Sequence, residues 1–460
     1  MKKSEKWITC VLSMAAALSL AACGSAAGTS TEQTGLAPAE SGAAAESSEA
    51  SEDSSGNGTN LSIMWWGSDA RHEATQEVLD LYAEKTGVTF SAEYTGWDGY
   101  WQKLPVLAAS NNMDDVLQMD AAYIHQYADN NQLADLTDLI DLSDVMSADE
   151  LENYKIDGKL YGVPLSRNGQ GYVYNKKLLD QYGIEEPENG WTMDEWKAWL
   201  YDARGKLPDG IYPLTDGRGA TNSYTSFQEY CQSLGGRKTL DGNDFNFDKA
   251  RYIEFQEMYN QFIEDGIVPP AEKSLSFVEL DPVNDSFING STVLRGVSVG
   301  SVGSLAAMVP DFDVRCISLP QGDGGAGWVQ STIFFAVGNN SEHKQEAADF
   351  IKFFVTDVEA GKILKTVRGL PLSDEVYAGF EDDLTEYEKK NMELYQTITA
   401  DGVRPVPYWD DVPTAFTDWN TEFNAQGQAI MLGETSIDKA ADYLEEQGRQ
   451  ASEDAKAKAK

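Results

Sequence analysis

The chain has 460 residues, and its 75 acidic and 35 basic side chains give a formal net charge of −40 at pH 7. Such an acidic excess repels polyanions, so it excludes nucleic acid and anionic lipid surfaces as partners. With 3 histidines in the whole sequence, no cluster of metal ligands is visible, and we expect no metal and no cofactor.

The N-terminus predicts export. Lysines precede an apolar run over residues 7–20, which is too short to span a membrane, and small residues follow it. We therefore expect a signal peptide at 1–22. Cys23 directly after the small residues resembles the lipobox of bacterial lipoproteins. This resemblance implies an extracytoplasmic protein that is anchored to the cell membrane by a lipid on Cys23, and an incidental cysteine is the alternative.

Residues 23–59 are rich in alanine, glycine, serine and acidic residues and contain no aromatic residue. Such a segment is too polar to bury a core, and we expect a flexible tether. The remaining length exceeds what one compact core usually organises, so it predicts two lobes.

The first folded segment predicts a β-α-β-α-β order. Apolar residues occupy both faces of its first strand, which is typical of a parallel strand covered on both sides. Helical spacing follows that strand, and Gly87 ends the first helix. We expect strands at 61–66, 88–96 and 113–120, and helices at 69–86 and 98–109.

Aromatic and polar residues gather where these strands end. Ligands of open parallel sheets bind beyond the carboxyl ends of the strands. An aromatic face suits the C–H side of a sugar ring, and polar groups suit its hydroxyls. We expect Trp65 to be core and Trp66 to face the ligand. The ligand-binding candidates of this region are Trp66, Ser68, Asp69, Arg71, Trp97, Asp98, Tyr100 and Asp120, although core packing is the alternative for Trp97 and Tyr100.

Several blocks in chain order resemble one known family. They include "WWGSDARHEA", "GKLYGVPLSRNGQGYVYNKKLLDQYGI" and "EAADFIKFFVTDVEAGKILKTVRGLPLS". They are similar to extracellular solute-binding proteins of ATP-driven carbohydrate importers, family 1, the class that includes maltose-binding protein. The resemblance implies an α/β, two-lobed periplasmic-binding-protein-like fold with a ligand cleft between the lobes. It also implies a carbohydrate ligand, docking onto the transmembrane permease subunits of an ABC importer, and a monomer that is not an enzyme.

The resemblance also divides the chain. It implies a first α/β lobe at 60–166 plus 332–385, a second at 167–331 plus 386–450, and a charged tail at 451–460. Segments that cross between the lobes line the cleft in such a fold. Further ligand-binding candidates on crossing segments are therefore Arg167, Asn168, Trp328 and Gln330. Candidates elsewhere are Tyr224, Arg368, Trp409 and Asp410. The alternatives for these residues are hinge structure, core packing or a surface ion pair.

Other functions stay open. "GVSVG" at 296–300 matches a nucleophile elbow, and His343 is the histidine downstream of it, but we expect this histidine to be a solvated residue at a helix start. A surface lipoprotein with hydrolase or adhesin activity, or a binder of a non-sugar solute, is the alternative function. The candidate arginines leave an acidic sugar possible, and Cys231 and Cys316 could pair or be buried as small apolar residues.

Overall fold

The computed structural model describes residues 58–218, 223–406 and 412–458. The predicted signal peptide, Cys23, most of the tether, and the candidates Trp409 and Asp410 lie outside these ranges. Within the ranges, no helix is both long enough and apolar enough to cross a membrane.

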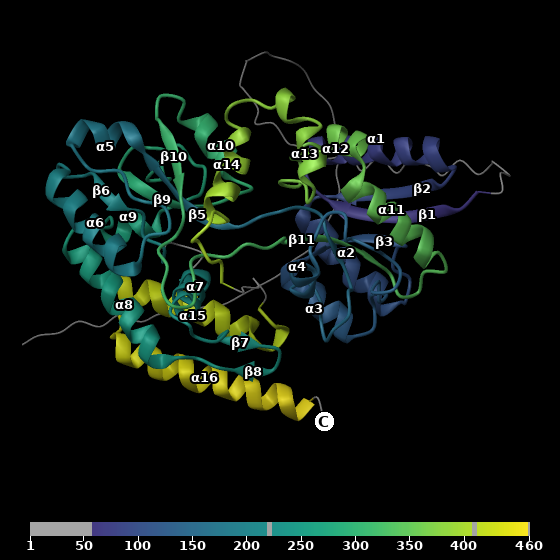
Figure 1. Ribbon diagram of the computed structural model, residues 1–460. Coiled ribbons are helices and arrows are strands. Elements are labelled where there is room, and N and C mark those ends of the chain that lie inside the picture. Colours follow the sequence, from purple (N-terminus) through teal and green to yellow (C-terminus); the bar gives the residue numbers. More distant parts are fainter. Residues whose placement is uncertain (1–57, 219–222, 407–411, 459–460) are drawn as a thin grey trace, which may run out of the picture. The chain divides into compact units, whose positions relative to one another are not determined.

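A five-stranded sheet organises the first lobe (Figure 1). Its strand order is β2-β1-β3-β11-β4. Strand β1 is parallel to β2 and β3, and β11 is antiparallel to β3 and β4. The strands are β1 (Asn60–Trp66), β2 (Thr89–Thr95), β3 (Val116–Asp120), β4 (Val163–Pro164) and β11 (Ile333–Val337). The predicted β-α-β-α-β order is confirmed.

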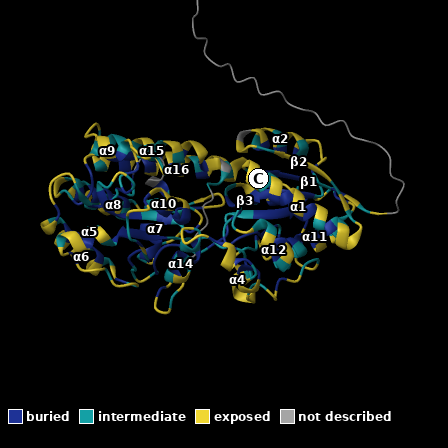
Figure 2. Ribbon diagram, turned by 90° about the horizontal axis from the view of Figure 1, so that it is seen from above, coloured by how far each residue is buried: buried dark blue, intermediate teal, exposed yellow. Residues whose placement is uncertain are grey.

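Helices cover both faces of this sheet, and strands β1, β3 and β11 are largely buried between them, whereas the edge strand β2 is mostly exposed (Figure 2). One buried cluster joins Ile63 and Trp65 of β1 to α1, α11 and α12, and the other joins Met64 and Trp66 to α2 and α3. As predicted, α1 ends at Gly87, whose φ of 79° suits a residue without a Cβ. The helices of this lobe are α1 (Asp69–Thr86), α2 (Trp97–Ala109), α3 (Ala121–Asp129), α4 (Ala148–Glu152), α11 (Lys344–Thr356) and α12 (Val358–Leu364).

A four-stranded sheet of order β10-β5-β9-β6 organises the second lobe. Here β5 is antiparallel to β9 and β10, and β6 is parallel to β9. The strands are β5 (Gln170–Asn175), β6 (Tyr212–Leu214), β9 (Thr292–Ser298) and β10 (Val314–Ile317), and β7 (Leu240–Asp241) and β8 (Asp244–Phe245) form a separate hairpin.

Helices also enclose the second sheet. One buried cluster includes residues of α5 (Lys176–Tyr182), α6 (Met193–Lys206), α7 (Ser223–Ser233), α8 (Lys249–Glu264), α15 (Thr417–Met431) and α16 (Ile437–Lys458). The other cluster includes residues of α10 (Val302–Met308), α13 (Asp374–Ala378) and α14 (Lys389–Ile398). The remaining short elements are α9 (Ala271–Leu275) and the 3-10 turns η1 (Glu381–Asp383) and η2 (Thr414–Phe416).

Segments that cross between the sheets are hydrogen-bonded to one another. The first crossing leads from β4 to β5, the second from β10 to β11, and the third follows α12. The backbone N–H of Gln170 donates to the carbonyl of Trp328 at 3.0 Å, and that of Gln330 donates to Asn168 at 3.0 Å. On the other side, the N–H of Arg167 donates to Leu370 at 2.7 Å. The first crossing therefore lies between the other two.

One segment packs differently from the division that the resemblance implies. Val376 and Phe380, which fall in the segment 332–385 of the predicted first lobe, share a buried cluster with Val173 and Val297 of the second sheet. The predicted lobe boundaries stay a prediction. The charged tail is part of α16, because this helix continues to Lys458 and the Ser452 hydroxyl donates to the Asn243 carbonyl at 2.5 Å.

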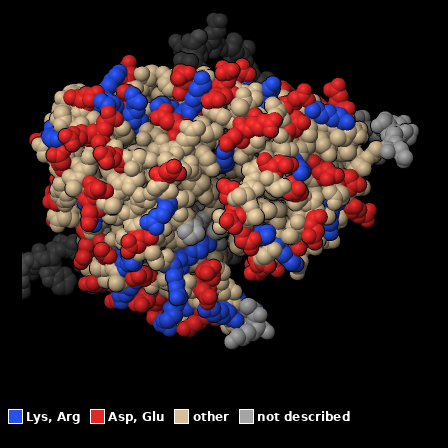
Figure 3. All heavy atoms as spheres, viewed as in Figure 1, with Lys and Arg blue, Asp and Glu red and all other residues tan. Residues whose placement is uncertain are grey.

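Charge is spread over the surface rather than gathered in one place. On the face shown in Figure 3, acidic side chains are scattered in small groups among uncharged residues, with lysines and arginines between them. Exposed ion pairs such as Lys206 with Asp202 (2.7 Å) contribute little to stability. The acidic excess therefore affects solubility and the choice of partners more than it affects the stability of the fold.

A half-buried carboxyl group makes stability depend on pH. Burial raises the pKa of Asp114, just before β3, from 3.8 to about 6, and repulsion from Glu93 adds to the rise. The folded state therefore favours protonated Asp114. This contribution is complete below the unfolded pKa and is lost as the pH rises through about 6.

We expect Asp114→Asn to raise the free energy of unfolding by about 1–2 kcal/mol at pH 7.5 and to leave it nearly unchanged at pH 4, after allowance for solvent screening. Urea unfolding at both pH values measures the difference. Asp129→Asn, at an exposed position at the end of α3, is the control. An equal gain for Asp114→Asn at both pH values would contradict this account.

Candidate functional site

In both sheets, the edge at which the parallel strands end lies next to the crossing segments. In the first sheet, β1, β2 and β3 end at the edge where β11 begins, since Asp120 pairs with Ile333. In the second sheet, β9 and β6 end at the edge where β5 begins, since Ser298 pairs with Gln170. Because the crossing segments join these edges, loops that follow the strands of both lobes lie beside them. This is where the sequence predicts the ligand.

The crossing residue Arg167 holds the third crossing segment in place. Its Nη1 lies 2.6 Å from Asp374, its Nε donates to the Pro371 carbonyl at 2.7 Å, and its guanidinium lies 4.9 Å from the ring centre of Tyr395. These contacts favour the alternative interpretation, hinge structure, for much of this side chain.

Asn168 and Gln330 complete the crossing. The Asn168 Oδ1 accepts from the backbone N–H of Gly300 at 3.2 Å. Gln330 is buried, and among the described residues its Nε2 has no hydrogen-bond partner. With Arg167, these side chains line a hollow of about 750 Å³ that α4 and α14 also border. The structure thus brings three of the four crossing candidates together.

Trp66 does not face solvent. It is 6% exposed, and its ring packs against Trp97, Tyr100 and Trp101 at centroid distances of 5.2, 4.9 and 5.5 Å. Both faces of β1 are covered by helices, so consecutive residues of this strand are buried alike. Trp65 is core as predicted, and Trp66 is core as well.

The neighbouring aromatic residues separate into core and surface. Tyr100 is fully buried, and its hydroxyl donates to the Gln118 carbonyl at 2.5 Å. Trp97, by contrast, is 43% exposed and lies directly after β2. Tyr123 of α3 is 36% exposed, and its ring centre lies 6.2 Å from that of Trp97. Trp97 and Tyr123 are two rings that a ligand can reach, and Tyr94 of β2 is also exposed.

The polar candidates of the first lobe stand at helix starts. Ser68 and Asp69 are exposed at the beginning of α1. Asp120 accepts from the backbone N–H of Ala122 and so caps α3. The side chain of Asp98 lies outside what the structure describes. Ser68 and Asp69 therefore remain open to a ligand near Trp97.

The two first-lobe arginines bind protein groups. Arg71 donates to the carbonyls of Trp66 (3.2 Å) and Val367 (3.1 Å), and burial lowers its pKa. Arg368 is 6% exposed, so its interpretation as a surface ion pair is wrong. It donates through Nε to Gln118 Oε1 at 3.1 Å and lies over Phe335 and Phe354. Burial holds its pKa well below the usual value.

Tyr224 of the second lobe and the crossing residue Trp328 are packing residues. Tyr224 is buried, with its ring edge-on to Trp419 and Phe423. Trp328 is buried against Val406. Cys231 and Cys316 are both free, so the disulfide alternative is wrong.

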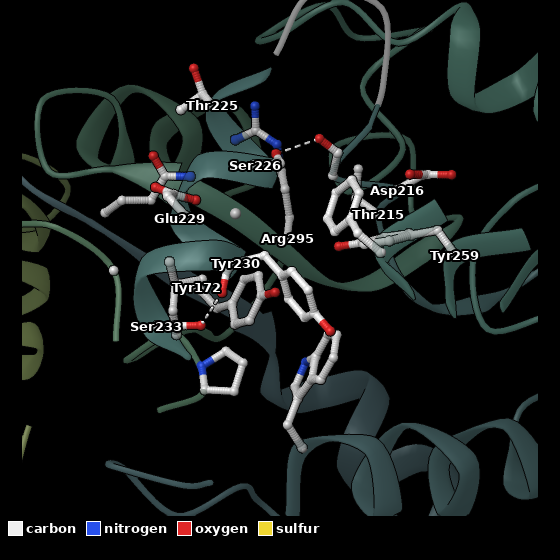
Figure 4. Close-up of a pocket in the computed structure, with 18 of the residues that line it drawn as sticks. Tyr172, Thr215, Asp216, Thr225, Ser226, Glu229, Tyr230, Ser233, Tyr259 and Arg295 are labelled. Atoms are coloured by element: carbon white, nitrogen blue, oxygen red, sulfur yellow. Dashed lines mark hydrogen bonds between the residues drawn. The ribbon is translucent and has the colours of Figure 1, made fainter. Parts of the chain in front are cut away.

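The second lobe contains a cavity of about 180 Å³ that none of the sequence-based candidates lines. Figure 4 shows its walls, with Tyr172 from β5, Tyr230 from α7, Tyr259 from α8 and Arg295 from β9. Glu229 and Asp216 lie among them, and Gln170 and Gly327 connect the cavity to the crossing segments. The one feature of the sequence that could have indicated this cavity was a charged residue inside the apolar strand "TVLRGV".

The "GVSVG" motif does not form a nucleophile elbow. Gly296 and Ser298 are residues of β9 itself, and the Ser298 hydroxyl bonds to that of Ser301 at 3.1 Å. His343 lies at the start of α11 in the first lobe, far from the second sheet in the fold. A short turn leads from β9 into α10, but a serine nucleophile also needs a base within reach, and the described histidines His72, His125 and His343 all belong to the first lobe.

A family model for bacterial extracellular solute-binding proteins matches residues 77–393. The chain belongs to this family. The carbohydrate ABC transporter substrate-binding protein of Streptococcus pneumoniae is 24% identical to this solute-binding protein over 291 residues, which cover 61% of this chain and 58% of that relative. The melibiose/raffinose/stachyose-binding protein of Bacillus subtilis is 24% identical over 303 residues, 62% of this chain and 63% of the relative.

A solved structure supports the fold. The periplasmic oligogalacturonide binding protein from Yersinia enterocolitica superposes with a TM-score of 0.70 at 22% identity, covering 86% of this chain and 100% of that chain. The predicted α/β, two-lobed solute-binding fold is confirmed.

The burial of Trp66 predicts a large effect on stability. We expect Trp66→Ala to lower the free energy of unfolding by about 3–5 kcal/mol, because the substitution leaves a cavity among three aromatic rings. Urea unfolding of the unliganded protein measures the loss. A change below about 0.5 kcal/mol would mean that the ring is not part of the core.

Proposed function

We propose that this solute-binding protein captures an oligosaccharide between its two lobes and delivers it to the permease subunits of an ABC importer. The names of the relatives in Streptococcus and Bacillus and of the Yersinia structure all refer to carbohydrates. The further elements of the proposal are a lipid anchor on Cys23, a monomer, and lobe boundaries as given by the resemblance.

The observation that carries the proposal is the open face of Trp97. A tryptophan that is 43% exposed at the end of a strand is unusual in a domain that buries most of its aromatic rings. The ring is held edge-on by Trp66 and Trp101, at centroid distances of 5.2 and 5.4 Å, so its orientation is fixed before a ligand arrives. A fixed aromatic face is suited to stacking against a sugar ring.

Polar groups lie at the neighbouring strand ends. Ser68 and Asp69 are exposed at the next strand end, and Asp120 lies at the end of β3. Carboxylate and hydroxyl oxygens of this kind accept from sugar hydroxyls, which gives the stacked ring a preferred orientation. Aromatic stacking flanked by directed acceptors is the combination that the sequence predicts for a pyranose site.

Lobe closure links binding to transport in this proposal. A sugar that contacts strand-end loops of both lobes binds the closed form better than the open form, and the ligand shifts the population toward closure by that difference in affinity. The permease then recognises the closed, loaded form. The hydrogen-bonded crossing segments supply the hinge about which such a movement occurs.

We expect Trp97→Ala to weaken sugar binding by at least tenfold while changing the free energy of unfolding by less than about 1 kcal/mol, since an exposed ring leaves little cavity. Calorimetric titration of the residue 58–460 fragment with melibiose, raffinose, stachyose and digalacturonic acid measures the affinity, and urea unfolding measures the stability.

Tyr443→Ala is the matched control, because Tyr443 is 39% exposed on α16 of the second lobe, away from the strand ends. If Trp97→Ala bound the sugar with unchanged affinity, the aromatic face of the first lobe would not be part of the binding site. A failure of every sugar to bind the folded parent protein would move the proposal to a non-sugar solute.

A further inference from the structure

The cavity of the second lobe has the size and chemistry of a binding site, yet no predicted ligand contact reaches it. It measures about 180 Å³, and cavities of about 150 Å³ in other proteins hold one six-membered ring. Three tyrosines and Trp196 form much of its wall. The cavity therefore has room for about one six-membered ring, and the ring's substituents and any further sugar units would extend outside.

Two residues of the cavity wall carry buried donors without partners. Among the described residues, Nε and Nη1 of Arg295 and Nε1 of Trp196 have no hydrogen-bond partner, although Arg295 is 2% and Trp196 also 2% exposed. Buried N–H groups are nearly always paired in native proteins, so such groups point to a ligand or water that pairs with them. Sugar hydroxyl oxygens are acceptors of the required kind.

The charges around the cavity disfavour an anion. The guanidinium of Arg295 already lies 3.0 Å from Asp285 and 3.3 Å from Glu279. The Asp216 carboxylate on the wall is held by Arg218 at 3.0 Å, and Glu229 adds a further acidic side chain. A ligand carboxylate would find more acidic than basic neighbours here, whereas neutral hydroxyls can donate to the carboxylates.

The tyrosines stay protonated and so remain donors as well as acceptors. Burial holds the pKa of Tyr172 and of Tyr259 well above its usual value, and burial also raises the pKa of Tyr230. Their rings offer apolar faces and their hydroxyls offer polar edges, which is what the two sides of a pyranose require.

We propose that this second-lobe cavity is a subsite that takes one uncharged pyranose unit at the end of the sugar and thereby selects neutral oligosaccharides over uronic acids. The inference rests on the proposed function and adds the chemical class of the ligand. Gln170 and Gly327 border the cavity at the ends of two crossing segments, so the terminal unit lies next to the hinge.

Gly296 offers a way to fill the cavity without breaking the fold. A Cβ on this residue would lie 3.8 Å from Gln170 Nε2 and 3.9 Å from Tyr172 Cε1, which is ordinary contact distance between two groups of the wall. Gly296→Leu therefore places its side chain in the space assigned to the sugar. Gly205→Leu is the matched control, because a Cβ there meets nothing within 4 Å.

The test is calorimetric titration of the parent protein and both variants with melibiose, raffinose, stachyose and digalacturonic acid, with circular dichroism and thermal unfolding to verify the fold. We expect at least one neutral sugar to bind the parent at least tenfold more tightly than digalacturonic acid. We also expect Gly296→Leu, but not Gly205→Leu, to weaken that neutral sugar by at least tenfold. Gly296→Ala, with a smaller side chain, should give a smaller loss and serves if the leucine variant does not fold.

Each other outcome has a distinct meaning. Preference of the parent for digalacturonic acid would leave sugar capture standing and overturn the neutral subsite. Equal affinities of the parent and a folded Gly296→Leu for a neutral sugar would overturn the cavity as the subsite. Binding of none of the four sugars by the folded parent would overturn the proposed carbohydrate function and this inference with it.

Discussion

The hydrogen bonds between the crossing segments constrain everything around the candidate site. Backbone groups in this buried region must find partners, and the segments provide them for one another through Arg167, Gln170 and Gln330. The first crossing pairs on one side with the second and on the other with the third. Movement of one lobe relative to the other must therefore bend all of them together, which favours rotation about one axis over sliding.

The buried arginines extend this constraint into the first lobe. The Trp66 carbonyl, at the end of β1, accepts from both Arg71 and Gln118. Arg71 also binds the carbonyl of Val367, and Arg368 binds Gln118. Through these hydrogen bonds, the end of β1 is thus linked to the segment that leads into the third crossing. Arg71 and Arg368 thus help to hold the site together, while both Nη atoms of Arg368 have no hydrogen-bond partner among the described residues.

Local patterns in the sequence were sufficient for the elements. Apolar spacing located β1, α1, β2 and β3, and Gly87 marked the end of α1 because a left-handed turn favours glycine. The same patterns could not separate Trp66 from Trp97. Burial depends on which helices cover each face, and the cover of Trp66 comes from α2 and from strands that are distant in sequence.

The cavity could not be predicted from the sequence for a related reason. Tyr172, Glu229 and Arg295 come from β5, α7 and β9, and no spacing between them is regular. Tyr224, in contrast, had the composition expected of a ligand contact but packs against Trp419. Residue type alone identifies what a side chain can bind, whereas the packing of distant segments decides whether it is free to do so.

Besides the hollow at the crossing segments, two regions open to a ligand belong to different lobes. The exposed ring of Trp97 follows β2 in the first sheet, and the cavity lined by Tyr172 lies in the second. A sugar held in the cavity gains the contact with Trp97 only in arrangements that bring the two lobes together. The free energy of that second contact is therefore available to drive closure, while the cavity, formed within one lobe, can bind before the lobes move. In the proposed function, selection of the sugar and closure upon it thus fall to separate lobes.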